Sequence, residues 1–186
     1  MSSAGYEIEI KLPVENSARA EAQVRSLGAN LVHERYFEDN YVFDQADGSL
    51  RNNRMLLRLR LANGSATLTF KGAPSYSDGL KVREEIESVI TQPEAFLQIL
   101  MKIGFSVTFR YQKYRTVYTT KEGLEISIDE TPIGNYLELE GEKGQIHDFA
   151  EALGYSRNQY ITESYAGLFA LWAKEHNPAA SFMIFE

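Results

Sequence analysis

Apolar and polar residues alternate along much of the chain, which is the pattern of β-strands that carry one apolar and one polar face. The segment YEIEIKL at residues 6–12 shows this most clearly, because its charged residues occupy the odd positions and its apolar residues the even positions. Gly-containing pairs such as Asn63-Gly64 and Asp78-Gly79 indicate hairpin turns. Together these signals predict strands at residues 6–12, 35–43, 55–62, 65–72, 80–90, 108–120, 124–130 and 135–141.

Four other segments repeat apolar residues every three or four positions, which predicts amphipathic helices. They are residues 16–28, 91–104, 145–153 and about 162–175. The first begins at Asn16, a favourable N-cap, and in the second Thr91 and Glu94 have the spacing of a capping box. Since each helix needs an apolar surface to cover, the pattern predicts one α+β domain with a large antiparallel sheet and helices against one of its faces.

We place this domain at residues 1–175 and a tail at residues 176–186. The tail ends in an apolar run at residues 182–185, which would pack against the domain or against a second subunit, or would stay disordered. The small and polar segment 72–79 fits either an ordinary loop or a mobile lid.

Composition and net charge mainly exclude certain classes of function. A net charge of -7 argues against a general nucleic-acid or anionic-membrane binder, because no diffuse basic field is present. The absence of cysteine excludes a thiolate metal site, and three scattered histidines argue against a zinc site or a Ser-His-Asp triad. The N-terminal residues lack signal-peptide features, and no apolar run approaches the roughly 20 residues of a membrane span. We therefore expect a cytoplasmic protein.

The polar face of the predicted strands is almost purely charged. Seven acids, Glu7, Glu9, Glu85, Glu87, Asp129, Glu138 and Glu140, accompany seven bases, Lys11, Arg58, Arg60, Lys71, Arg83, Lys113 and Arg115. An antiparallel sheet with one face in water would explain any single strand. The full set, in which arginine is prominent, favours a sheet that curls until its charged faces look inward at one another.

Burying these charges in a lumen would cost free energy unless they were paired with one another or bound to a ligand. A row of arginine and lysine suits a polyanion, and clustered carboxylates suit a hard cation such as Mg²⁺ or Mn²⁺. Two glutamates on one strand, as in Glu7 with Glu9 and Glu138 with Glu140, repel each other unless a cation lies between them. A triphosphate with bound metal meets both requirements.

The charged motifs, taken in order, resemble the signature of the CYTH superfamily, also called triphosphate tunnel metalloenzymes. The series begins with EIEIK at residues 7–11 and continues through LRLR, TFKG, REEIE, YQKYR, SIDE and LELE. It extends from about Tyr6 to Trp172, which is nearly the whole chain. The family includes class IV adenylyl cyclases, thiamine triphosphatases and inorganic triphosphatases. The segments DNYVFD, PIGNYLELE and ESYAGL most resemble the class IV cyclase branch.

The resemblance implies an eight-stranded antiparallel β-tunnel, or barrel, with a charged lumen and amphipathic helices packed outside. It implies phosphate contacts by Lys11, Arg58, Arg60, Lys71, Arg83, Lys113 and Arg115. It implies metal-side carboxylates at Glu7, Glu9, Glu138 and Glu140, with Glu85, Glu87 and Asp129 as further ligands or orienting partners. Lys11, Glu9 and Glu85 are the candidate catalytic residues, which would orient an attacking water.

Three functions fit this site. Hydrolysis needs a water in line with the terminal phosphorus, whereas cyclisation needs the ribose 3′-hydroxyl of ATP and a pocket for adenine and ribose. No short motif indicates such a pocket, and parity directs Tyr114 away from the lumen. We predict metal-dependent hydrolysis of ATP, thiamine triphosphate or tripolyphosphate, with ATP cyclisation or a non-catalytic polyphosphate-binding module as alternatives. Family members are often dimeric, which leaves a homodimer open.

Overall fold

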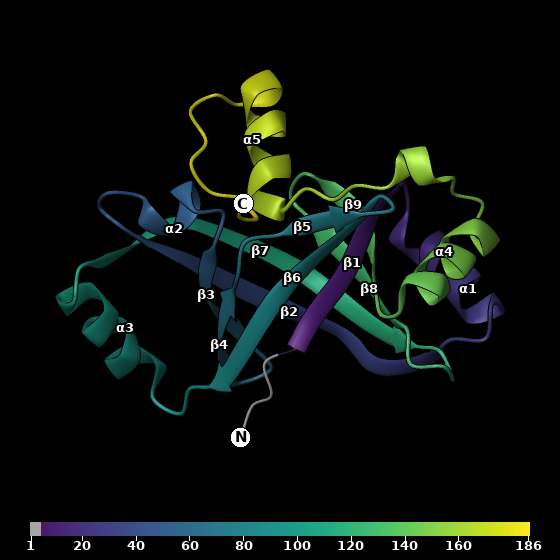
Figure 1. Cartoon of the computed structure of the whole chain (residues 1–186), viewed down its shortest axis with the longest axis horizontal. Helices are drawn as coiled ribbons and strands as arrows, with labels where there is room; N and C mark the ends of the chain where they lie inside the picture. Colours follow the sequence, from purple (N-terminus) through teal and green to yellow (C-terminus); the bar gives the residue numbers. More distant parts are fainter. Residues whose placement is uncertain (1–4) are drawn as a thin grey trace.

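The predicted strands are all present in the computed structural model, which describes residues 5–186, and they close into a barrel (Figure 1). They are β1 (Gly5–Val14), β2 (Asn30–Gln45), β3 (Leu56–Ala62), β4 (Ser65–Lys71), β6 (Leu80–Val89), β7 (Phe105–Thr119), β8 (Glu125–Thr131) and β9 (Gly134–Glu140). Hydrogen bonds order them β1-β9-β8-β7-β2-β3-β4-β6, and β1 also pairs with β6, so the last strand of this order meets the first. All these pairs are antiparallel, which confirms the expected barrel.

The helices lie around this barrel (Figure 1). They are α1 (Ser17–Ser26), α2 (Ser49–Asn52), α3 (Pro93–Lys102), α4 (Lys143–Ala152) and α5 (Tyr165–His176), with a 3₁₀ turn, η1, at Arg157–Gln159. The predicted cap of α1 is confirmed, because the Asn16 side chain accepts a hydrogen bond from the Arg19 backbone N–H at 2.9 Å. In the described chain no helix is both long and apolar enough to cross a membrane.

The predicted capping box at the start of α3 is wrong. The N-cap is Gln92, which makes no side-chain capping bond, and Pro93 is the first helical residue. With Thr91 as the cap, Gln92 would need a helical conformation directly before a proline, which the proline ring disfavours. The helix therefore begins one residue later than the capping-box spacing requires.

The hydrophobic core lies outside the barrel, between its outer surface and the helices. The largest cluster places Ile10, Leu12, Ile126, Leu137 and Leu139 of the strands against Ala20 and Val24 of α1 and Ile146 and Ala150 of α4. A second cluster lies between strands β2 to β4 and α3. Because alternate residues of a strand point to opposite faces, burial of these apolar side chains on the outside directs the charged positions inward.

Three local features go beyond the sequence prediction. Strand β2 begins at Asn30 rather than at residue 35, because its first part pairs with the end of β7. A three-residue strand, β5 (Ser75–Ser77), forms within the segment 72–79 and pairs with β6. The short helix α2 is held by the Asp44 carboxylate, which accepts hydrogen bonds from three backbone N–H groups at 2.8–3.0 Å.

The C-terminal tail packs against the domain along the open edge of β7. The backbone N–H of Met183 donates to the Arg110 carbonyl at 3.0 Å, and the N–H of Gln112 donates to the Met183 carbonyl at 2.8 Å. The Met183 side chain is fully buried in a cluster with Tyr111, Tyr165 and Phe169. Of the alternatives for the tail, packing within the chain is therefore the one observed.

We expect Met183→Ala to destabilise the protein by about 2–4 kcal/mol, because it leaves a cavity where a fully buried side chain was. Ile184→Ala is the matched control, since the neighbouring Ile184 is 38% exposed and its truncation should cost less than about 1 kcal/mol. Urea denaturation measures both values. Equal losses for the two variants would mean that the tail does not dock through Met183.

Candidate functional site

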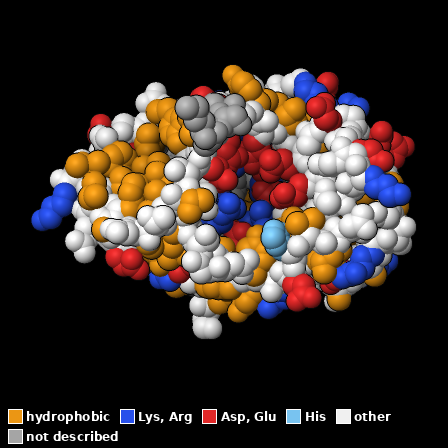
Figure 2. Space-filling model, turned by 90° about the horizontal axis from the view of Figure 1, so that it is seen from below, with side chains coloured by type: hydrophobic (Ala, Val, Ile, Leu, Met, Phe, Trp, Pro, Cys, Tyr) orange, Lys and Arg blue, Asp and Glu red, His pale blue; other side chains and the backbone are white. Residues whose placement is uncertain are grey.

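The inward-facing side chains of the barrel surround a cavity of about 260 Å³ that is lined mainly by charge. Eight bases line it, Lys11, Arg58, Arg60, Lys71, Lys81, Arg83, Lys113 and Arg115, and seven acids, Glu7, Glu9, Glu85, Glu87, Glu125, Glu138 and Glu140. Figure 2 looks into the molecule from below, where Asp and Glu side chains surround a hollow and Lys and Arg side chains lie deeper. We call this cavity the lumen.

The charged face of the sheet is buried and is not an ordinary solvent-exposed face. Glu9 and Lys11 are each only 3% exposed, and Lys113 is 2% exposed. Thirteen of the fourteen charged residues predicted for the site line the lumen. The exception is Asp129, which is completely buried and contacts two of the lumen bases.

Asp129 holds one group of cationic side chains in place. Its carboxylate accepts a hydrogen bond from Lys113 at 2.9 Å and two from Arg115 at 2.7 Å each. The Tyr165 hydroxyl donates to the same carboxylate at 2.6 Å, and burial together with this carboxylate raises the pKa of Tyr165 well above its ordinary value. Asp129 therefore fixes the positions of two bases and keeps the tyrosine hydroxyl protonated.

Lys11 lies between two carboxylates of the lumen. Its Nζ is 3.2 Å from Glu138, which it faces directly across the β1–β9 pair, and 3.5 Å from Glu9. Burial alone would favour the neutral amine, but attraction by Glu138 and then by Glu9 outweighs it and raises the pKa of Lys11. Lys11 is therefore a cation at neutral pH, which suits it to bind a phosphate oxygen and not to accept a proton.

The closing pair of strands, β1 and β6, brings further acids and bases together. Glu9 faces Lys81 in the register of these strands, and their side chains form an ion pair. The Nζ of Lys71, at the end of β4, is 2.6 Å from Glu7 and 3.1 Å from Glu85. This part of the lumen exists only because β1 and β6 meet.

Arg58 and Arg60 project from β3 into the lumen. The Nη1 of Arg58 donates to the Tyr111 hydroxyl at 3.1 Å, and its Nη2 donates to Thr69 Oγ1 at 3.1 Å. Thr69 in turn donates to Glu87 at 2.6 Å, and Arg60 lies 3.5 Å from the same carboxylate. The guanidinium of Arg58 is therefore held by two hydroxyl groups and lies 3.6 Å from the Glu87 carboxylate, so it is oriented before a ligand binds.

Three glutamates come together on adjacent strands of the barrel. Glu140 faces Glu9 in the β1–β9 pair and Glu125 in the β8–β9 pair. Like charges directly opposite each other on a sheet repel. Burial, and after it repulsion from Glu7, raises the pKa of Glu140 to about 8.

Sequence reasoning did not single out several residues that contribute to the site, among them Lys81, Tyr111, Glu125, Glu38 and Tyr165. Lys81, Tyr111 and Glu125 line the lumen, and Glu38 is fully buried beside its bases. Strand parity could have found Lys81 and Tyr111, because each lies two positions before a predicted lumen base, Arg83 or Lys113. Glu125 shares the parity of Asp129 on β8. Glu38 offered no such signal, because the neighbouring Asp39 is equally charged.

Glu38, on β2, balances bases on the two strands that pair with it, β3 and β7. Its carboxylate lies 3.6 Å from Lys113, 3.9 Å from Arg60 and 4.0 Å from Arg115. Burial would raise the pKa of Glu38, but the attraction of Lys113 and Arg115 outweighs burial and lowers it to about 2. Glu38 is therefore ionised at any physiological pH.

The acids of the lumen offer oxygen ligands of the kind that hard divalent cations prefer. Within residues 5–186, no group of three or more His, Asp or Glu side chains is arranged to hold a metal ion by itself. Mg²⁺ commonly binds through one or two carboxylates together with substrate phosphates, so the donor set still fits such an ion. The facing glutamates Glu9 and Glu140 are suited to it, because a cation between them would relieve their repulsion.

Comparison with known proteins places the chain in a family. The sequence model of the CYTH domain matches residues 5–165, which is most of the chain. The chain belongs to the CYTH family. A Methanocaldococcus jannaschii protein named "Putative adenylate cyclase" is 32% identical over 173 residues, a match that covers 87% of this chain and 97% of that protein. The family resemblance of the charged motifs is thus confirmed.

Solved structures of two other proteins share the fold. A Vibrio parahaemolyticus protein described as a "putative adenylate cyclase" has a TM-score of 0.78 at 18% identity and covers 90% of this chain and 99% of its own. A Hippeastrum protein, described as a "putative adenylyl cyclase" with a dominant triphosphatase activity, has a TM-score of 0.63 at 22% identity and covers 93% and 96%. At these identities the likeness establishes the CYTH barrel and no more.

Proposed function

We propose that this CYTH protein is a divalent-metal-dependent enzyme that hydrolyses triphosphates bound in the lumen. One observation carries the proposal: eight cationic side chains and seven carboxylates line the same cavity of about 260 Å³. Such a cavity needs a polyanion and a cation to balance its two sets of charges. The description of the Hippeastrum protein as a triphosphatase supports the same reaction class.

The bases of the lumen would bind the phosphate oxygens. Lys113 and Arg115 are already oriented by Asp129, and Arg58 by Tyr111 and Thr69. Cations held in place before the substrate arrives stabilise the charge that develops in the transition state without a cost of reorganisation. Hydrolysis of a triphosphate depends mainly on this kind of positioning and charge stabilisation.

The carboxylates would bind the metal and orient water. We assign the metal, Mg²⁺ or Mn²⁺, to the paired glutamates of β1 and β9, namely Glu7, Glu9, Glu138 and Glu140. When bound, the metal would neutralise charge on the phosphate oxygens. Glu9 or Glu85 would orient a water in line with the terminal phosphorus, and Lys11 would bind a phosphate oxygen beside it.

Product analysis tests the proposal. The protein is incubated with ATP, thiamine triphosphate and tripolyphosphate in the presence of Mg²⁺ or Mn²⁺, and the products are identified. Orthophosphate release is the expected result, and EDTA should abolish it until excess Mg²⁺ or Mn²⁺ is restored. EDTA saturated beforehand with Mg²⁺ is the control. Product release that persists without divalent metal would contradict the assigned role of the glutamates.

The second candidate function is cyclisation of ATP to cyclic AMP and pyrophosphate. The name of the M. jannaschii relative favours it. Pyrophosphate and cyclic AMP from ATP, without orthophosphate, would replace hydrolysis by this function. Tight binding of tripolyphosphate without any metal-stimulated product would instead support a polyphosphate-binding module. A cytoplasmic location and a homodimer stay predictions from the sequence.

A further inference from the structure

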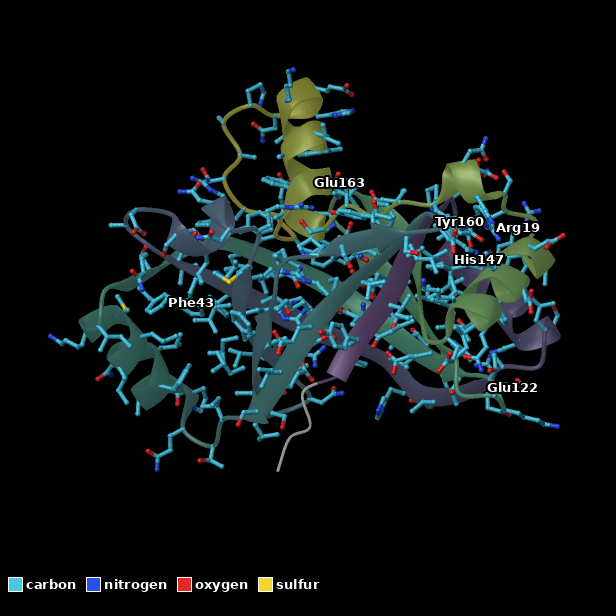
Figure 3. All side chains as sticks on the ribbon, viewed as in Figure 1. Arg19, Phe43, Glu122, His147, Tyr160 and Glu163 are labelled. Carbon is cyan, nitrogen blue, oxygen red and sulfur yellow. The ribbon has the colours of Figure 1, made fainter. Side chains whose placement is uncertain are left out.

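Two buried tyrosines lie between the C-terminal tail and the bases of the lumen. Tyr111 belongs to β7 and Tyr165 is the first residue of α5, and both line the lumen. Their ring centres are 5.8 Å apart, and both rings belong to the cluster that contains the fully buried Met183 side chain. Figure 3 labels Glu163, two residues before Tyr165, at the end of α5 that lies next to the barrel. The tail is therefore separated from the lumen by these two rings.

The Tyr165 side chain contacts several charged groups of the lumen at once. The centre of its ring is 5.3 Å from the Lys11 Nζ and 5.1 Å from the Lys113 Nζ. An ammonium group at such a distance is attracted to the face of an aromatic ring. The Tyr165 hydroxyl donates to Asp129 Oδ2, the same oxygen that accepts hydrogen bonds from Lys113 and from Nη2 of Arg115. A displacement of this one ring would therefore disturb two lysines and the carboxylate that orients Arg115.

Tyr111 makes a second connection between the tail and the site. Its hydroxyl accepts a hydrogen bond from Nη1 of Arg58 at 3.1 Å. Its backbone forms a parallel β-bridge with Met183, and the N–H of Gln112 donates to the Met183 carbonyl at 2.8 Å. Strand β8 pairs with β7 only from Tyr114 onward, so the tail takes the place of a neighbouring strand beside Tyr111.

The tail lies beyond residue 165, where the match to the CYTH domain ends. It is nevertheless joined to β7 by more than Met183. The Phe185 ring centre is 5.3 Å from that of Tyr114, and the Phe185 N–H donates to Gln112 Oε1 at 3.2 Å. Figure 1 shows the chain returning toward the barrel after α5, so that the C-terminus lies at the base of this helix. The tail is thus docked beside the site although it is outside the matched domain.

We propose that the C-terminal tail is a positioning element of the phosphate-binding site, in which Met183 holds Tyr111 and Tyr165 where they orient the lumen bases. The inference rests on the proposed function, because it assumes that these bases bind the triphosphate. Met183 does not line the lumen, so it acts on a ligand only through the two tyrosines.

Close packing explains how one apolar side chain can affect distant charges. Protein interiors leave few voids, and truncation of a fully buried side chain leaves a space into which its neighbours move. Hydrogen bonds weaken steeply when their angles and distances change, so a small shift of either ring would misalign the bases that it contacts. A tail with a purely structural role would instead stabilise the fold without changing the affinity of the folded molecules.

Titration calorimetry with tripolyphosphate in an EDTA-containing buffer tests the inference without turnover. We expect Met183→Ala to raise the Kd about tenfold, because misplaced binding groups lose much of their effect. Urea denaturation gives the folded fraction of each variant, and the apparent Kd is corrected by this fraction. Loss of folded protein alone therefore cannot produce the expected change.

Three further variants of the tail make the comparison specific. Met183→Leu should restore the Kd to within about twofold, because leucine has a volume close to that of methionine. Met183→Val removes less volume than alanine and should raise the Kd about threefold, which keeps the test decisive if Met183→Ala fails to fold. Ile184→Ala is the matched control, since Ile184 is 38% exposed and does not line the lumen, and its Kd should be unchanged.

Tyr165→Phe tests the same path without creating a cavity. It removes the hydroxyl that bonds to Asp129 and should raise the Kd about fivefold. In the double variant, Met183→Ala with Tyr165→Phe, the combined loss should be smaller than the product of the two separate losses, because both changes act through one side chain. Independent effects would multiply.

The outcomes separate this inference from the proposed hydrolysis. An unchanged corrected Kd in Met183→Ala and Met183→Val, or losses that multiply in the double variant, would overturn the inference and leave hydrolysis standing. Weaker binding by these variants, together with no product from the unaltered protein and Mg²⁺ or Mn²⁺, would support the inference and overturn hydrolysis. If the unaltered protein did not bind tripolyphosphate, both would fail.

Discussion

We expect Arg58→Ala to lower the turnover of triphosphates about a hundredfold or more while the protein stays folded. Arg58 is buried in the lumen, and its bonds to Tyr111 and Thr69 aim its guanidinium before a ligand arrives. Its loss also removes repulsion from the nearby Lys71 ammonium, which offsets part of the lost hydrogen bonding. The free energy of unfolding should therefore change by less than about 2 kcal/mol.

Arg35→Ala is the matched control for this prediction. Arg35 also bonds to a carboxylate, that of Glu130 at 2.8 Å, but its side chain is 51% exposed and it does not line the lumen. Its removal should leave turnover unchanged. Steady-state kinetics with each substrate and urea denaturation of both variants provide the comparison. Full activity in Arg58→Ala would contradict the assignment of phosphate binding to the lumen.

We expect Asp129→Asn to cause the largest loss of stability among substitutions in the site, about 3 kcal/mol or more. The fully buried carboxylate bonds to Lys113 and Arg115, and removing one partner of a buried ion pair leaves uncompensated charge. Because asparagine has a similar shape to aspartate, the loss of stability would come from the missing charge and not from a change in packing. Urea or thermal denaturation measures it.

Asp39→Asn provides the comparison for Asp129→Asn. Asp39 accepts two hydrogen bonds from Arg110, at 2.9 and 2.6 Å, but the Arg110 side chain is 34% exposed. Solvent compensates the loss of a partner there, so the cost should stay below about 1 kcal/mol. If both variants unfolded with the same free energy, Asp129 would not be a structural counter-ion of the lumen bases.

Alternation in the sequence revealed the strands and most of the charged lumen, because strand parity alone decides which residues share a face. It did not reveal which acid pairs with which base. Glu9 meets Lys81 through the closing β1–β6 register, 72 positions along the chain, and no local pattern encodes that register. The sequence also did not show that Glu38 rather than Asp39 lies beside the lumen bases, because the two acids are adjacent. Asp39 forms an ion pair with Arg110 instead.

For a related reason, the sequence did not predict a cavity of about 600 Å³ that shares Leu56, Lys81, Arg83 and Ser164 with the lumen. Its walls come from elements that are far apart in sequence, namely β2, β3, β7, the segment 72–79 and α5. Periodicity describes one element at a time, so it cannot report a space between several elements.

The closure of the barrel through β1 has a consequence for the newly made chain. Strand β1 pairs with β6 on one edge and with β9 on the other, and β9 ends only at Glu140. A ribosome synthesises the chain from its N-terminal side, so β1 emerges before β9 and stays without its second neighbour until β9 has been synthesised. Until then its edge stays unpaired, and contacts between such distant strands form slowly. We expect folding to finish only after β9 has emerged, with aggregation as the competing outcome for chains that end before it.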